Sequence, residues 1–211
     1  MPNRFFALIV MVVGVAALAA PTASKAQTPT LHHLPNVTAT ELDGRLLETI
    51  EEQTEAALEE VGRRLEALGL TYRDVVVSNV FLRDSRLFQG MNGVYRTFFD
   101  TAPPTRATVE ADLPNPDALI QFTFVATPDA KEFVAPSGLR SPALPYSWGI
   151  RVGNTLFVSG ATSRDPDTFQ PVTGDVPTQT RRVFGNVGMV LEAGGMGYED
   201  LVSCKVFLND P

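Results

Sequence analysis

The sequence is poor in the residues that build disulfide frameworks, metal sites and nucleic-acid interfaces. Its 211 residues include one cysteine and two histidines, and 24 acidic residues outnumber 17 basic ones, for a net charge of −7. A single cysteine excludes a disulfide framework and the zinc sites built on two or four cysteines. The acidic balance argues against a phosphate-binding surface, which needs clustered Lys and Arg. Apolar residues make up 44% of the chain, enough for a packed core, and we expect Cys204 to be a small buried hydrophobe within it.

The N-terminal stretch has the layout of an export signal. Arg4 precedes an apolar run over residues 5–20, and Ser24-Lys25-Ala26 offers small residues at the −3 and −1 positions of a cleavage site. A membrane anchor is the alternative, but the run is shorter than the roughly 20 residues that span a bilayer. We therefore predict that residues 1–26 are a cleaved signal peptide and that the mature protein is exported, to the periplasm or outside the cell, and free of the membrane. The remaining 185 residues carry a net charge of −9, because Arg4 and Lys25 are removed.

Hydrophobic periodicity predicts a mixture of helices and strands. Apolar residues at three- and four-residue steps predict helices, and short β-branched runs predict strands. The predicted helices cover 46–68, 85–99 and 177–193, and the predicted strands cover 74–82, 106–113, 119–126, 149–152, 155–159 and 200–208. Gly153-Asn154 is a two-residue hairpin turn, and the proline-containing stretch 127–145 predicts a linker. The glycines of 194–197 follow a helix, which favours a C-cap over a phosphate-binding loop, whose glycines precede one.

The chain contains an internal repeat. Residues 53–84 and 179–210 align without a gap at an offset of 126, and 15 of the 32 aligned positions are identical. The same offset places the hairpin 149–159 opposite residues 23–33, where no strand pair is predicted. It also leaves the second copy without a counterpart of the predicted elements between residues 85 and 126. We interpret the chain as two incomplete tandem copies and expect a truncated reading frame; a circularly permuted single domain over 72–211 is the alternative.

Segments of both copies resemble the RidA family of imine deaminases, also called the YjgF or endoribonuclease L-PSP family. In the first copy the resemblance rests on residues 74–84 (DVVVSNVFLRD), on 91–95 (MNGVY), and on 104–114. The last segment resembles the signature P-x-R-x-x-V-x-x-x-x-L-P, with one residue fewer between Val109 and Leu113. In the second copy it rests on Ser141-Pro142, Pro145-Tyr146, residues 152–160 (VGNTLFVSG) and Asp165-Pro166.

The resemblance implies an α+β, chorismate-mutase-like fold in which two helices pack on one face of a mixed sheet. It implies two RidA-like domains: residues 27–134, lacking the N-terminal hairpin, and residues 135–211, truncated at the C-terminus. Domains of this family assemble as trimers with ligand clefts between neighbours, so we expect a homo-oligomer.

The resemblance also implies the site. Arg106 corresponds to the arginine that binds the carboxylate of a 2-imino acid, and a planar guanidinium can grip a carboxylate through two charge-assisted hydrogen bonds. Asn92 corresponds to the cleft asparagine, Tyr146 to the cleft tyrosine, and Ser159 with Gly160 to the serine–glycine pair. The alternatives are a surface salt bridge for Arg106, a helix-surface amide for Asn92, and packing roles for the others. Because these residues come from both copies, we expect a composite cleft, formed between copies in one chain or between chains.

Two residues, Thr123 and Thr108, differ from the family pattern. Thr123 stands where active deaminases carry a glutamate, Gln121 on the same face is also neutral, and Thr108 replaces a cysteine common in the family. A threonine hydroxyl binds water but is not a base at neutral pH. The expected function is therefore a deaminase that hydrolyses 2-imino or 2-enamino acids to 2-keto acids and ammonia, with no metal or cofactor. The alternative is a non-catalytic module that binds a small carboxylate. The acidic charge disfavours the ribonuclease activity once attributed to the family.

Overall fold

The structure is a computed structural model that describes residues 9–11, 15–16, 28–43, 45–138 and 142–208. The chain divides into two compact units, each described by itself. The Arg106 unit comprises Thr30–Ala130 with Pro142–Tyr146, and the Ser159 unit comprises the preceding residues with Lys131–Ser141 and Ser147–Pro211. The predicted signal peptide lies outside the described residues, except for two short strands. None of the helices in the described ranges is long and apolar enough to cross a membrane.

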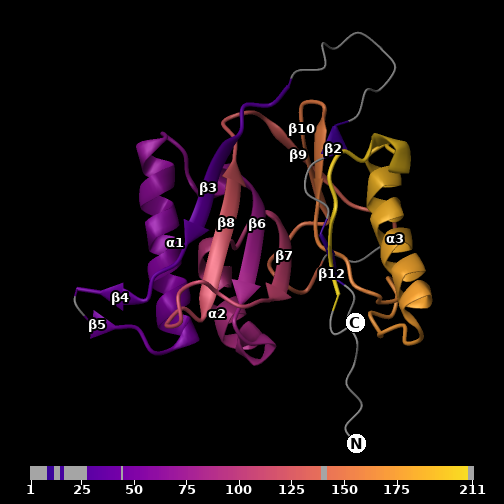
Figure 1. The fold of residues 1–211 in the computed structure, drawn as a ribbon. Coiled ribbons are helices and arrows are strands. Elements are labelled where there is room, and N and C mark those ends of the chain that lie inside the picture. Colours follow the sequence, from indigo (N-terminus) through magenta and orange to yellow (C-terminus); the bar gives the residue numbers. More distant parts are fainter. Residues whose placement is uncertain (1–8, 12–14, 17–27, 44, 139–141, 209–211) are drawn as a thin grey trace, which may run out of the picture. The chain divides into compact units, whose positions relative to one another are not determined.

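The Arg106 unit is built on a four-stranded mixed sheet in the order β3–β8–β6–β7 (Figure 1). The strands are β3 (His32–Val37), β6 (Val75–Leu82), β7 (Thr105–Glu110) and β8 (Ile120–Ala126). β8 runs antiparallel to both β3 and β6, whereas β6 and β7 run parallel. A parallel pair needs a crossover connection, and here a helix supplies it. This arrangement confirms the predicted mixed sheet.

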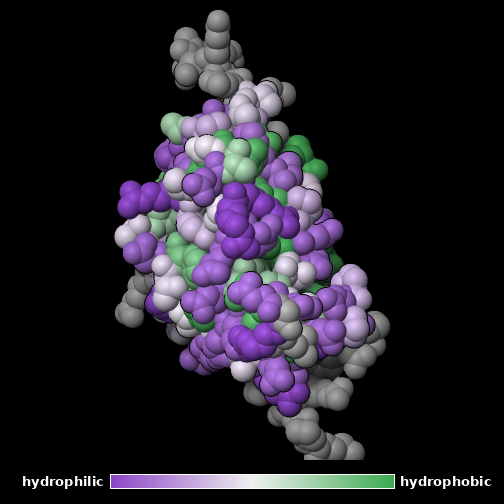
Figure 2. Space-filling model, turned by 90° about the vertical axis from the view of Figure 1, so that its left-hand side faces the viewer, coloured by the Kyte–Doolittle hydropathy of each residue, from purple (hydrophilic) through white to green (hydrophobic). Residues whose placement is uncertain are grey.

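Two helices, α1 (Ile50–Ala67) and α2 (Phe88–Phe98), pack on one face of this sheet. A single hydrophobic core joins residues of α1, α2 and the alternate strand positions that face them: Leu58, Val61, Leu65, Met91, Tyr95, Val80, Leu82, Phe122 and Phe124. The opposite side of α1 is exposed and charged, and the surface seen from the side of α1 is mainly hydrophilic (Figure 2). The α+β class with two helices on one sheet face is therefore confirmed.

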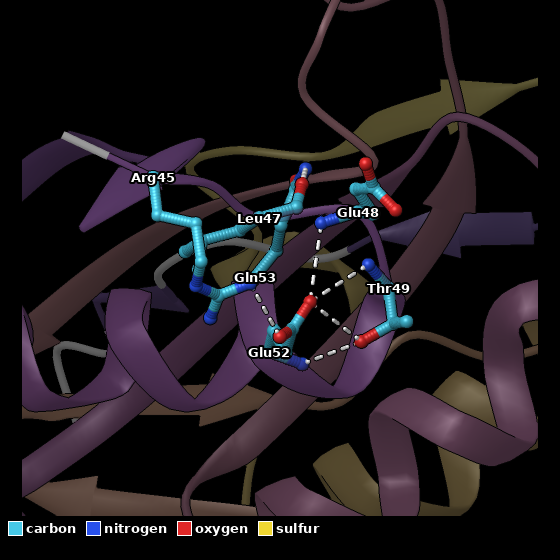
Figure 3. A network of polar contacts seen from close by, with 6 residues as sticks. All are labelled: Arg45, Leu47, Glu48, Thr49, Glu52 and Gln53. Carbon is cyan, nitrogen blue, oxygen red and sulfur yellow. Dashed lines mark hydrogen bonds and ion pairs between the residues drawn. The ribbon is translucent and has the colours of Figure 1, made fainter.

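The first turn of α1 is fixed by a capping box, so the helix begins four residues later than the periodicity predicted (Figure 3). Thr49 Oγ1 accepts a hydrogen bond from the Glu52 amide at 3.2 Å, and the Glu52 carboxylate accepts from the amides of Thr49 and Glu48. Arg45 Nη1 lies 2.8 Å from Glu52 Oε1. These hydrogen bonds lower the pKa of Glu52, and the bond from the Thr49 amide has the largest effect. Residue 46 belongs to β5 (Arg45–Leu46), which pairs with β4 (Glu41–Leu42).

The Ser159 unit has its own sheet and one long helix. The sheet order is β9–β10–β11–β2, and a further pair joins β12 to β1. Helix α3 (Val176–Ala193) packs its apolar face on the sheet through Val183, Val187 and Leu191, against Leu156 and Val158. The strands are β1 (Ile9–Met11), β2 (Val15–Ala16), β9 (Lys131–Val134), β10 (Gly149–Val152), β11 (Thr155–Val158) and β12 (Lys205–Phe207).

Most predicted elements are present, with corrections at their ends. The β10–β11 hairpin turns at Gly153, whose φ of 55° lies in the left-handed region that glycine tolerates. The predicted helix 85–99 begins as a 3-10 turn, Ser85–Leu87, before α2, and another, Tyr198–Asp200, replaces the start of the predicted strand 200–208. The sequence prediction missed strands β1 to β5, as well as β9 within the predicted linker. Cys204 is exposed, so the prediction that it is buried is wrong: it lies just before β12 and is not part of the hydrophobic core described for this unit.

Candidate functional site

Arg106 is the second residue of β7, which follows Pro103 and Pro104 directly. The two prolines restrict the backbone as it enters the strand, and the parallel pairing of Arg106 with Ser78 on β6 holds its Cα. The residue is 6% exposed, and its guanidinium lies on the sheet face that carries α2. This burial rules out an exposed strand-edge arginine with a surface salt bridge.

Asn92 on α2 holds the guanidinium. Arg106 Nη1 donates to Asn92 Oδ1 at 2.8 Å, and Asn92 Nδ2 donates to the carbonyl of Phe88, one turn earlier, at 2.7 Å. The second bond orients the amide so that its oxygen faces the arginine. Asn92 is buried, which rules out the helix-surface amide alternative.

Three aromatic rings surround the same guanidinium. Arg106 Cζ lies 4.9 Å from the ring centroid of Tyr95, 5.8 Å from that of Phe88 and 6.0 Å from that of Tyr146. Phe88, Asn92 and Tyr95 share one face of α2, because residues four and three positions apart are neighbours on a helix. Sequence reasoning missed Phe88 and Tyr95, although this spacing was a signal that could have found them. Cation–π contact adds to the hydrogen bond in fixing the cation.

The electrostatics of the cluster follow from its burial. Burial lowers the pKa of Arg106, the nearby Tyr95 and Tyr146 oppose that effect, and the positive charge of Arg96 adds to it. A guanidinium nevertheless keeps its charge at neutral pH. Burial also raises the pKa of Tyr95 to about 12, so this phenol is neutral beside the cation. The cluster therefore presents a permanent, partly desolvated positive charge in a fixed orientation, which suits a planar anion.

The predicted site residues do not all fall in one unit. Arg106, Asn92 and Tyr146 come together in the Arg106 unit, although the sequence grouped Tyr146 with the second copy. Ser159 and Gly160 belong to the Ser159 unit and follow β11. There the Ser159 amide donates to the carbonyl of Trp148 at 3.0 Å, and its hydroxyl donates to the carbonyl of Ser147 at 2.6 Å. Through these two hydrogen bonds, Ser159 connects the end of β11 to the residues just before β10.

Thr123 lies on the opposite sheet face from Arg106 within this unit. Thr123 pairs with Asn79 on β6, whereas Arg106 pairs with Ser78, and side chains of adjacent strand residues point to opposite faces. The Thr123 hydroxyl accepts a hydrogen bond from Asn79 Nδ2 at 3.0 Å. Gln121 shares that face. The side chain at the family's glutamate position therefore does not adjoin Arg106 of the same unit.

Thr108 shares the sheet face of Arg106, two residues further along β7. Its Oγ1 is buried and makes no hydrogen bond to any described residue. A buried hydroxyl without a partner is uncommon, and a water molecule or a ligand atom can satisfy it. The hydroxyl therefore extends the polar groups beside the cation.

A hollow in the Arg106 unit lies away from the Arg106 cluster. A cavity of about 280 Å³ lies between the 3-10 turn before β6 and the end of α2, lined in part by Tyr72, Arg73 and Asp100. It includes none of the predicted site residues. Among the described residues, no group of three or more His, Cys, Asp or Glu side chains is arranged to hold a metal ion.

The Arg106 unit is thus a mixed α+β domain with two helices on one sheet face and a buried, hydrogen-bonded arginine. A family model described as Endoribonuclease L-PSP matches residues 36–127 and 138–211, and the chain belongs to this family, which is the RidA or YjgF family of the sequence resemblance. The match in two segments is consistent with two copies.

The matching relatives carry several names. A RutC family protein of Pyrococcus abyssi is 41% identical over 81 residues, which are 38% of this chain and 64% of that protein. The 2-iminobutanoate/2-iminopropanoate deaminase of Mus musculus is 33% identical over 76 residues, which are 35% of this chain and 56% of the enzyme. The chain thus spans between about half and two thirds of the length of these relatives. The crystal structure of NMB1025, a YjgF family member from Neisseria meningitidis, is 29% identical, with a TM-score of 0.43 over 47% of this chain and 82% of that one.

Proposed function

We propose that this protein is a RidA-type deaminase that hydrolyses reactive 2-imino and 2-enamino acids, with Arg106 as the anchor of the substrate carboxylate. The observation that carries the proposal is the buried Arg106 guanidinium, held by Asn92 and enclosed by Tyr95, Phe88 and Tyr146. A charge held in this way costs little reorganisation when an anion binds, because its geometry is already fixed.

The proposed reaction needs little more than orientation. A water oxygen adds to the carbon of the C=N bond and one proton of that water moves to the nitrogen, which gives a carbinolamine. The remaining hydroxyl proton then moves to the nitrogen as the C–N bond breaks, so that ammonia leaves and the carbonyl of the 2-keto acid forms. An enamino acid first takes up a proton at carbon to give the imine. Such imines hydrolyse spontaneously, so positioning the substrate and a water supplies the modest acceleration required. We assign that water to the Thr108 hydroxyl, whose oxygen is buried on the sheet face of Arg106 and has no hydrogen-bond partner among the described residues.

A second candidate function is a module that binds a small carboxylate without turning it over. The observation that favours it is Thr123, a neutral residue that lies on the sheet face opposite Arg106 and is bonded to Asn79. In this alternative the anchor is retained and no side chain activates water.

The assembly and location belong to the same proposal. Ser159 and Gly160 of one chain complete the cleft of another chain in a trimer-like homo-oligomer, and the protein acts after export. Light scattering of the purified protein tests the assembly: a trimer supports a cleft shared between chains, whereas a monomer contradicts it. Mass spectrometry of the exported protein tests cleavage after Ala26.

The experiment that tests the activity uses an imine made in place. A threonine dehydratase generates 2-iminobutanoate, and the release of 2-oxobutanoate and ammonia is followed with the wild type, Arg106→Lys, Arg106→Ala and Thr108→Val. We expect the wild type to accelerate release and Arg106→Ala to lower kcat/KM by roughly 10- to 100-fold, the value of a hydrogen bond to a charged group. Arg106→Lys recovers part of the loss, because it keeps the charge without the planar fork.

The matched control is Arg86→Ala. Arg86 is an exposed arginine of the same unit that ion-pairs with Asp84, and its loss leaves the rate unchanged. Normal turnover by a folded Arg106→Ala protein would contradict the proposed anchor. Carboxylate binding by calorimetry without any acceleration would replace the deaminase with the binding module. Loss of turnover in Thr108→Val with unchanged carboxylate affinity supports the assigned water position.

A further inference from the structure

The N-terminal strands pair with two strands of the Ser159 unit. β1 runs antiparallel to β12, with Ile9 opposite Phe207, Val10 opposite Val206 and Met11 opposite Lys205. β2 runs antiparallel to β11, with Val15 opposite Leu156 and Ala16 opposite Thr155. Two short strands from one stretch of chain thus pair with the edges of both β11 and β12.

The pairing of β1 reproduces the register of β8 in the Arg106 unit. Across the 126-residue repeat, Val206 corresponds to Val80 and Phe207 to Phe81. In the Arg106 unit these two counterparts pair with Phe122 and Gln121 of β8, also antiparallel. Val10 therefore takes the register position of Phe122, and Ile9 takes that of Gln121.

The pairing of β2 with β11 has the same antiparallel direction as the pairing of β1 with β12. In the Arg106 unit β8 lies between β3 and β6 and runs antiparallel to both. In the Ser159 unit β2 pairs with β11 and β1 pairs with β12, each antiparallel. β1 and β2 belong to two different sheets of the Ser159 unit, and β1 takes beside β12 the position that β8 takes beside β6, although its sequence is unrelated to the repeat.

Exposed apolar residues in and beside β12 explain why another strand can pair with it. Val206 in β12 is 51% exposed, and Val202 and Leu208 on either side of the strand are 64% and 59% exposed, whereas their counterparts Val80, Val76 and Leu82 are almost wholly buried. An apolar strand with open backbone groups and exposed side chains attracts another strand.

We propose that β11 and β12 form a strand-acceptor site in the Ser159 unit and that its occupant is the apolar N-terminal segment of the same chain, through β1 and β2. Backbone hydrogen bonds on both sides supply the binding, and apolar β-branched residues suit the strand. The segment predicted to be an export signal thus has a second role as a structural strand while it remains attached. Its removal after Ala26 exposes both strand edges of this unit.

A disulfide trap tests the register in the full, uncleaved chain. In a Cys204→Ser background, Val10→Cys is combined with Val206→Cys, the residue opposite it, or with Val202→Cys as the control. Residues directly opposite on antiparallel strands have the Cβ separation that a disulfide needs, and residues four positions away do not. We expect the Val10/Val206 pair to form an intramolecular disulfide at least about ten-fold faster than the Val10/Val202 pair, a difference set by geometry because both partner positions are exposed. Equal rates, or no disulfide in either pair, would overturn the proposal.

A second measurement does not depend on introduced cysteines. In the full chain, Val10→Pro removes a backbone donor from β1, and hydrogen exchange is then followed at β12 and β6. We expect faster exchange at Lys205–Phe207 and unchanged protection at Val75–Leu82, which serves as the internal standard. Unchanged exchange at β12 would contradict the pairing. Both results are independent of deaminase activity.

Discussion

The two units contain the same repeated sequence in different surroundings. Val80 and Val206 are the same residue at equivalent positions of the repeat, yet Val80 is fully buried and Val206 is half exposed. In the Arg106 unit, α2 and β8 cover the strand, and the described residues of the Ser159 unit offer no equivalent helix over β12. A residue's identity in a repeat therefore does not determine its burial, because the elements packed on it do.

Other repeated residues keep the same contact in both units. The Tyr72 hydroxyl donates to the carbonyl of Leu58 at 2.7 Å, and the Tyr198 hydroxyl donates to that of Phe184 at 2.6 Å. A tyrosine thus ties the turn after each long helix back to that helix. Arg106 and Asn92 lie outside the repeated segments. The repeat accordingly marks the scaffold, and the unrepeated part of the Arg106 unit carries the candidate site.

The largest predicted effect comes from truncating one leucine in each unit. Leu82→Ala leaves a cavity in the core of the Arg106 unit and should cost about 2–5 kcal/mol, the usual range for a buried leucine. Leu208→Ala removes an exposed side chain and should change the free energy of unfolding by less than about 0.5 kcal/mol. Denaturant unfolding followed by circular dichroism measures both. Equal losses would contradict the difference in burial between the units.

Alanine at the repeated glycines should act alike in both units. A Cβ at Gly62 would lie 2.4 Å from the hydroxyl oxygen of Tyr72, and one at Gly188 would lie 2.4 Å from that of Tyr198. We expect each alanine to destabilise its unit by about 1–3 kcal/mol through overpacking, as measured by thermal unfolding. Adding Tyr72→Phe to Gly62→Ala should recover part of the loss, because it removes the atom that the methyl group meets. No recovery would show that the tyrosine is not the cause.

The repeated glutamines should differ by about one hydrogen bond. Gln53 Nε2 donates to the carbonyls of Leu47 and Asp117, and its Oε1 accepts from the Leu119 amide. Gln179 instead bonds the Gly174 carbonyl and the Ser163 hydroxyl. Gln53→Leu should therefore destabilise the protein by about 1 kcal/mol more than Gln179→Leu, in denaturant unfolding. A larger loss for Gln179→Leu would reverse the comparison.

The smallest effect is the pH dependence of the α1 cap; hydrogen bonds with Thr178 likewise lower the pKa of Asp175, the N-cap of α3. The pKa of Glu52 is lowered in the folded state, so the stability it contributes is present above its ordinary value of 4.5 and is lost as the pH falls through the lowered value. Glutamine also serves in a capping box. Glu52→Gln should thus be slightly less stable than the wild type at pH 7 and equal to it at strongly acid pH. A difference that persists in acid would contradict this assignment.

The sequence predicted the elements and the family better than it predicted the boundaries and the site contacts. Periodicity does not reveal that Thr49 caps α1, because the capping box stands inside the apolar pattern. The prolines around β9 obscured a strand that depends on pairing with β10, a long-range contact. Arg106 and Asn92 were predicted through the family pattern. Their mutual hydrogen bond and the enclosing rings of Phe88 and Tyr95 depend on how α2 packs over β7, which no local pattern specifies.

The most direct test of the Arg106 site is side-chain NMR during titration with 2-oxobutanoate, the keto-acid product and a stable carboxylate. The Nε–H resonance of Arg106 and the side-chain amide of Asn92 should shift with a common dissociation constant, and Arg151 on β10 of the Ser159 unit should not respond. The same titration of Arg106→Lys should show a weaker constant at Asn92. If the Arg106 and Asn92 resonances stay unchanged while the keto acid binds elsewhere, the Arg106 cluster is not the carboxylate anchor.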